Sequence, residues 1–198
     1  MTAAEDPIEL LARVLAQTAG LIDGTGVELA THPTPCRSWD VGRLISHLLF
    51  DLKQFTLRAT GGNPDWTQPF EDVEDDWLHR FEAGAEELVA AWRAAGDLGG
   101  VIELPGGGTL PARFPVDQQI AEFAVHGWDL ARATGQSTGG LDHEAALASL
   151  AWGRGALSPE YRGAEEENHA FGPEVSVPEG ASPYDRLAAF FGRDPAWH

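Results

Sequence analysis

The chain has 198 residues, of which 31 are acidic and 13 basic, so its formal net charge is −18. This charge excludes binding to nucleic-acid backbones and anionic membrane surfaces, which both require clustered Lys and Arg. Cys36 is the only cysteine, which excludes an internal disulfide and favours a reducing compartment, and no apolar run reaches membrane-spanning length. Hydrophobic residues make up 43% of the sequence, enough for a buried core. We therefore expect a cytoplasmic protein that binds neither nucleic acid nor membranes, with residues 1–198 forming one domain.

Apolar residues recur at helical spacing along most of the chain, and Pro, Ser or Asp stands where several of these segments begin. Gly-rich or Pro-rich loops separate the segments. The pattern predicts helices from Pro7 to the loop that begins at Gly24, from Ser38–Asp40 to Gly61, over 76–95, over 115–134 and over 142–156, with a short helix near 183–191.

Residues 101–104 and 109–114 flank the segment Pro105–Gly108 and predict a short hairpin or an irregular excursion. The number of helices and the short loops between them favour an all-α fold. We expect a four-helix bundle with an extra helix, with the C-terminal tail 157–198 packed on it.

Glu122 and His126 are four residues apart on one predicted helix, so they lie about 40° apart on one face. His47 sits midway along the second predicted helix, near the border of its apolar stripe. If the two helices are neighbours, all three side chains can meet at the edge of the core. A carboxylate and two imidazoles suit a divalent ion such as zinc, nickel or iron(II), with zinc favoured. Three protein ligands leave a position for water or substrate, as in catalytic zinc sites.

Two aspartates lie close to these candidate ligands. Asp51 is one turn beyond His47, where it could orient a ligand or substrate, but a solvated carboxylate at the helix border is favoured. Asp129 is three residues beyond His126, and pairing with Arg132 on the same helix is favoured over a role beside the metal. Cys36 is interpreted as a loop residue rather than a reactive thiol.

The local sequences also resemble a known family. The segments are TPCRSWD at 34–40, LISHL at 44–48, EFAVHGWDLARATG at 122–135, GPEVSVP at 172–178 and GRDPAW at 192–197. Together they are similar to an actinobacterial family of metal-binding proteins in the superfamily of DinB-like proteins and mycothiol-dependent maleylpyruvate isomerases. The resemblance covers nearly the whole chain.

The resemblance implies an up-down-down-up DinB-like bundle with a metal held by His47, Glu122 and His126. Characterised relatives are isomerases and S-transferases, in which the metal activates the thiol of mycothiol or bacillithiol. The resemblance thus implies mycothiol as a cosubstrate, a small electrophile as its partner and a homodimer as a plausible assembly. The maleylpyruvate isomerases carry a second, C-terminal domain for which this chain is too short, which leaves the reaction itself open.

Three functions fit these observations. The preferred one is a metal-dependent thiol S-transferase or isomerase that acts on a small electrophile, with its catalytic residues beyond the metal ligands unknown. The second is a non-catalytic module that captures a small ligand through the metal. The third is a bundle in which the metal has a purely structural role.

Overall fold

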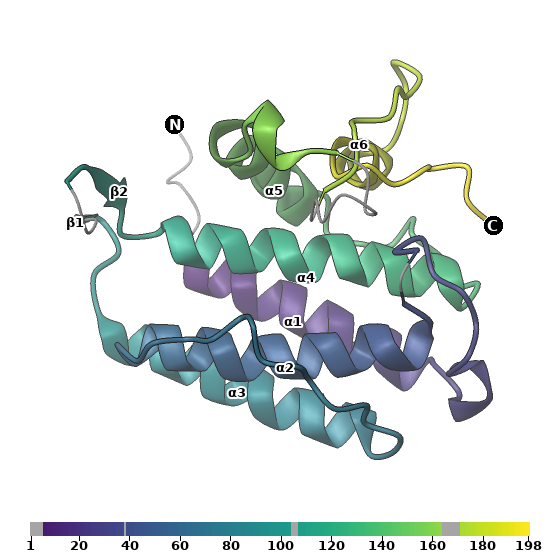
Figure 1. Ribbon diagram of the computed structural model, residues 1–198, viewed down its shortest axis with the longest axis horizontal. Helices are drawn as coiled ribbons and strands as arrows, with labels where there is room; N and C mark the ends of the chain where they lie inside the picture. The colour runs from purple at the N-terminus through teal and green to yellow at the C-terminus, as the bar shows by residue number, and fades with distance from the viewer. Residues whose placement is uncertain (1–5, 38, 104–106, 164–170) are drawn as a thin grey trace.

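The computed structural model describes residues 6–37, 39–103, 107–163 and 171–198, and it is mainly helical (Figure 1). The described elements agree with the expected all-α fold. In chain order the helices are α1 (Pro7–Asp23), α2 (Val41–Ala59), α3 (Trp77–Ala95), α4 (Phe114–Ala133), α5 (His143–Ala156) and α6 (Pro183–Phe190). Two short 3₁₀ turns, η1 (Val27–Leu29) and η2 (Pro159–Tyr161), lie in the connections.

Side-chain caps set most of the helix starts. The carboxylate of Asp6 accepts from the backbone N–H of Ile8, and that of Asp40 accepts from Arg43 N–H at 2.9 Å. Asp142 caps α5, and Ser182 caps α6. Ser38, the other predicted cap of the second helix, lies outside the described residues.

The first four long helices form the bundle. α1 packs against α3 and α4, and α2 packs against the same two helices, so α1 and α2 sit diagonally opposite each other. Segment 60–76 returns along the bundle after α2, so α2 and α3 run in the same direction (Figure 1). This is the up-down-down-up order that the resemblance implied.

α5 and α6 cover the side of α4 that faces away from the bundle (Figure 1). As a result most of α4 is buried, including polar side chains such as Gln119 and Asp129. This burial matters for the site because α4 carries two of the three candidate metal ligands.

A short antiparallel hairpin precedes α4. Strands β1 (Val101–Glu103) and β2 (Thr109–Pro111) pair with Ile102 opposite Leu110. The second strand is shorter than expected because α4 begins at Phe114, one residue before Pro115. Leu104, the expected end of the first strand, and Pro105 and Gly106 of the expected connection lie outside the described residues. No helix among the described residues has the length and apolar character needed to cross a membrane.

Candidate metal centre

The structure brings His47, Glu122 and His126 together between α2 and α4. Glu122 Oε1 lies 3.0 Å from His47 Nε2 and 3.1 Å from His126 Nε2. One atom from each residue lies within 4.8 Å of the others, as the spacing on the two helices predicted. Ligands bound to one zinc ion lie about 2.0–2.2 Å from it, so these three atoms need only small shifts to share an ion.

The three side chains differ in exposure. His126 is 8% exposed, His47 15% and Glu122 27%. The centre is therefore closed on the His126 side and reaches solvent on the Glu122 side. An ion held there would keep an accessible coordination position, which is the arrangement of catalytic rather than structural sites.

The charges of the site hold its groups in distinct protonation states. Burial disfavours the charged form of His126, but the carboxylates of Glu122 and Asp129 outweigh it and raise its pKa to about 9. Burial of Glu122 acts to raise its pKa, yet the two imidazoles, His126 first, hold that pKa well below its usual range. Burial lowers the pKa of His47, which favours the neutral form of this ring.

Asp51 is not the solvated border carboxylate that was favoured from the sequence. Its side chain is 4% exposed, and its Oδ2 lies 3.3 Å from His47 Nε2. Burial and the nearby charge of Glu122 raise the pKa of Asp51 well above its usual range. Asp51 thus borders the centre, although it is not among the three residues whose ligand atoms converge.

The expected pairing of Asp129 with Arg132 is also wrong. Asp129 is fully buried, and its Oδ2 lies 2.9 Å from His126 Nδ1 and 3.0 Å from Arg193 Nη2. Arg132 instead donates to the backbone carbonyls of Pro195 and Trp197. Asp129 and Arg132 have these partners because the C-terminal segment covers this face of α4. The helical pattern of the sequence alone could not show that contact.

Trp39 covers the two imidazoles. Its ring centroid lies 4.3 Å from that of His47 and 5.6 Å from that of His126. The hydroxyl of Thr34 fixes the loop that carries it by donating to the carbonyls of Cys36 and Trp39. Trp39 also packs against the core at the start of α2, and no local sequence pattern indicates its contact with the candidate ligands.

Phe70 completes the aromatic surroundings. It comes from the connection between α2 and α3, and its ring centroid lies 5.7 Å from that of His47. The guanidinium of Arg43 lies over the Phe70 ring at 3.7 Å and pairs with Asp72. The connection is thereby held against α2 beside the candidate ligands.

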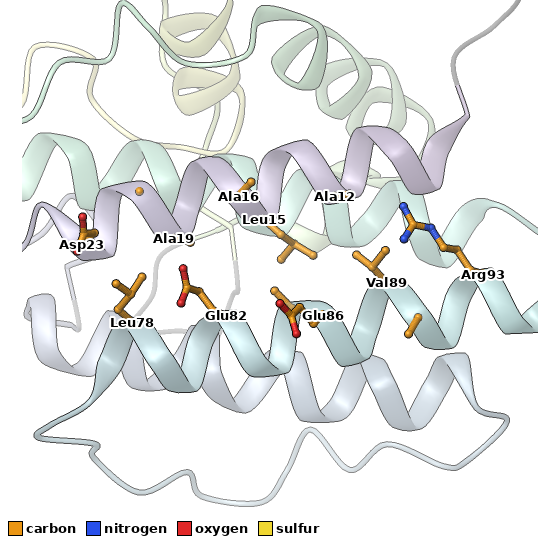
Figure 2. A pocket seen from close by; sticks show the side chains of 13 residues that line it. Ala12, Leu15, Ala16, Ala19, Asp23, Leu78, Glu82, Glu86, Val89 and Arg93 are labelled. Atoms are coloured by element: carbon orange, nitrogen blue, oxygen red, sulfur yellow. The ribbon is translucent and has the colours of Figure 1, made fainter.

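A surface groove of about 710 Å³ lies elsewhere, between α1 and α3 (Figure 2). Small side chains of α1, such as Ala12 and Ala16, line one side of the groove. Glu82 and Glu86 of α3 line the other side. None of the three candidate ligands lines this groove. The groove and the candidate metal centre are therefore separate features of the structure.

Comparisons with known proteins place the fold and the family. Residues 11–131 match the family model described as the mycothiol maleylpyruvate isomerase N-terminal domain. Uncharacterised proteins from two strains of Mycobacterium tuberculosis, CDC 1551 / Oshkosh and ATCC 25618 / H37Rv, are each 30% identical over 188 residues. These alignments span 95% of this chain and 98% of each relative.

The crystal structure of the mycothiol-dependent maleylpyruvate isomerase is similar in fold, with a TM-score of 0.55 at 18% identity. The match covers 73% of this chain and 66% of that one. The expected DinB-like bundle is therefore confirmed as a fold. Since the family model spans more than half of the chain and includes all three candidate ligands, the chain belongs to the mycothiol maleylpyruvate isomerase N-terminal domain family.

Proposed function

We propose that this protein holds one divalent metal ion, zinc, through His47, Glu122 and His126, and activates a small thiol with it. The observation that carries the proposal is the convergence of the two Nε2 atoms on Glu122 Oε1, at 3.0 and 3.1 Å, on a side that reaches solvent. Two imidazoles and one carboxylate are a donor set that zinc accepts readily.

The thiol is of the mycothiol type, because the family model and the similar crystal structure are both described by mycothiol-dependent isomerisation. A metal ion in this position would lower the pKa of a thiol that coordinates it and so supply a thiolate at neutral pH. The thiol proton leaves to solvent, and the sulfur forms an S–C bond with a small electrophile. An S-transferase then releases a leaving group with its electron pair. In an isomerase the S–C bond forms at a C=C double bond, which becomes a single bond and can rotate; breaking the S–C bond restores the double bond and expels the thiolate, which takes a proton from solvent.

The residues of this chain have separate tasks in that scheme. His47, Glu122 and His126 hold the ion, and Asp129 accepts a hydrogen bond from Nδ1 of His126. Trp39 and Phe70 place aromatic surface beside the imidazoles, which keeps bulk water from that side of the centre.

A structural metal is the main alternative, and one observation favours it: the ligands come from two helices, α2 and α4, so an ion would tie them together. The 27% exposure of Glu122 argues for the catalytic version, since structural zinc is normally closed by a fourth protein ligand. A non-catalytic module that captures a thiol would share the same centre.

The first test is elemental analysis of tag-free wild-type protein and of His126→Ala, with His79→Ala as the matched control. His79 is an exposed histidine on α3, so this variant should retain the metal. About one zinc per chain in the wild type and the control, and none in His126→Ala, is the expected result. No metal in any of them, even after reconstitution, would refute the proposal.

The second test is turnover of small electrophiles with mycothiol by the same three proteins. Zinc-dependent consumption of the electrophile by the wild type and His79→Ala, but not by His126→Ala, would support catalysis. Binding of mycothiol by calorimetry with no product by mass spectrometry would identify a binding module instead. Metal retention with neither binding nor turnover would favour the structural role.

Cytoplasmic location and the assignment of 1–198 to one domain remain predictions alongside this proposal.

A further inference from the structure

We propose that Arg193 and Asp129 position the His126 imidazole for metal binding, which makes the C-terminal segment a working part of the metal centre. The inference rests on the proposed metal site and goes beyond its ligand set. Neither residue would touch the ion, so both are positioning residues.

Asp129 and Arg193 form a buried chain of contacts that ends at His126. Asp129 Oδ2 lies 2.9 Å from His126 Nδ1, and Arg193 Nη2 lies 3.0 Å from the same oxygen. Arg193 Nε is 3.3 Å from both oxygens of the carboxylate. The side chain of Asp129 is 0% exposed and that of Arg193 is 10% exposed, so water competes little for these contacts.

The carboxylate decides which ring nitrogen of His126 faces the ion. An ionised carboxylate can only accept hydrogen bonds, so Nδ1 of His126 must carry the proton that it donates to Asp129. In the neutral ring the lone pair is then on Nε2. This is the nitrogen that lies 3.1 Å from Glu122 Oε1, on the ligand side of the ring.

Arg193 makes this arrangement stable. A buried carboxylate with only a neutral imidazole beside it would be costly, because burying an uncompensated charge costs several kcal/mol. The guanidinium supplies the compensating charge and fixes the carboxylate through several contacts. Nη1 of Arg193 also donates to the carbonyl of Phe191, at 3.0 Å. With its donors used in this way, Arg193 is arranged to position Asp129 rather than to bind an anionic substrate.

The backbone that follows α6 places Arg193 beside Asp129. Gly192 follows α6 in the left-handed region with φ +84°, and Arg193 N–H donates back to the carbonyl of Ala188 at 2.9 Å. A Cβ on Gly192 would lie 2.7 Å from Cα of Gly172, so only glycine fits this close approach of two backbone segments. The segment lies outside the part of the chain that matches the family model, which ends at residue 131.

The test measures the zinc dissociation constant by competition with a chromophoric chelator. The variants are Arg193→Gln, Asp129→Asn and the double variant. Each single variant should bind zinc about 10- to 100-fold more weakly, the range found when partners of metal ligands are removed. The double variant should be no weaker than the weaker single one, because both substitutions break the same chain of contacts.

The matched control is Arg186→Gln. Arg186 is an exposed arginine on α6 that donates to the backbone carbonyls of Ala181 and Glu179, away from Asp129. It removes one positive charge from the same segment and should leave the zinc affinity within about twofold of the wild type.

A readout of the ring itself separates positioning from stability. Nitrogen-15 NMR of the zinc-loaded wild type should show His126 protonated at Nδ1, and Arg193→Gln should show a mixed or altered state. If Arg193→Gln lowers only the free energy of unfolding, with unchanged zinc affinity and an unchanged His126 spectrum, this inference is wrong while the proposed metal site stands. A wild type that binds no zinc would overturn both. If Arg193→Gln fails to fold, Arg193→Lys, which keeps the charge but not the planar fork, should show the affinity loss.

Discussion

Zinc affinity should depend steeply on pH, because uptake of the ion must displace a proton from His126. In the metal-free protein the pKa of His126 is raised to about 9, since the charges of Glu122 and Asp129 outweigh the opposing effect of burial. A metal binds only the neutral ring. Below pH 9 the ring is protonated, so lower pH weakens binding.

The size of the effect follows from that value. Each pH unit below about 9 weakens binding about tenfold, or about 1.4 kcal/mol. Between pH 8 and pH 6.5 the dissociation constant should therefore rise about 30-fold. The pKa of His47 is lowered by burial, so its ring favours the neutral form and adds less to the slope than His126.

The assay is chelator competition at constant ionic strength, with calorimetry in buffers of different ionisation enthalpy to count the protons released. About one proton should be released per zinc at pH 7. His79→Ala should reproduce the wild-type slope because His79 is exposed on α3. A constant affinity with no proton release between pH 6.5 and pH 8 would refute the reasoning about His126.

The other predictions concern single side chains. Zinc at 100 times its dissociation constant should stabilise the wild type by about 2.7 kcal/mol in urea unfolding, and Glu122→Gln at the same zinc concentration should lose this gain. Asp51→Asn should retain about one zinc per chain by elemental analysis, because Asp51 lies beside the converging ligands but not among them. Gly153→Ala should lower the free energy of unfolding by about 1–3 kcal/mol, since its Cβ would lie 2.6 Å from the buried ring of Phe190. Gly127→Ala, whose Cβ would meet its nearest neighbours at 3.5 Å, should raise it by about 0.5–1 kcal/mol.

These variants also have clear contrary outcomes. A Glu122→Gln protein that zinc stabilises as much as the wild type would remove Glu122 from the ligand set. Loss of zinc from Asp51→Asn would mean that Asp51 itself holds the ion. A Gly153→Ala protein as stable as the wild type would show that α6 moves away from α5 without cost, and a Gly127→Ala protein less stable than the wild type would show that the added methyl group does not fit.

Local sequence signals were sufficient for the helices and for placing Glu122 and His126 together. Caps such as Asp40 and Asp142 mark helix starts through hydrogen bonds within one turn. The spacing of Glu122 and His126 places them on one face whatever the rest of the chain does. The approach of His47 required two helices to be neighbours, which the family resemblance implied and the fold provides.

The partners of the ligands could not be found in the same way. Asp129 has Arg132 three residues away, a local pairing that looks sufficient until α5 and α6 are placed over α4. Its actual partner, Arg193, follows a separate helix and shares no periodic pattern with it. The expectation for Asp51 was wrong for the same reason, because the burial of this side chain depends on segments distant in sequence.

The direction of access to the centre follows from the same packing. The C-terminal segment closes the His126 side, where Asp129 and Arg193 fill the space behind the ring. Glu122 is the most exposed of the three candidate ligands, so the proposed thiol would approach from its side. Trp39 and Phe70 lie against the His47 ring, and both come from loops rather than from the bundle helices. The bundle and the C-terminal segment would therefore hold the ion. Substitutions in these two loops would change which electrophile the protein accepts without changing metal binding.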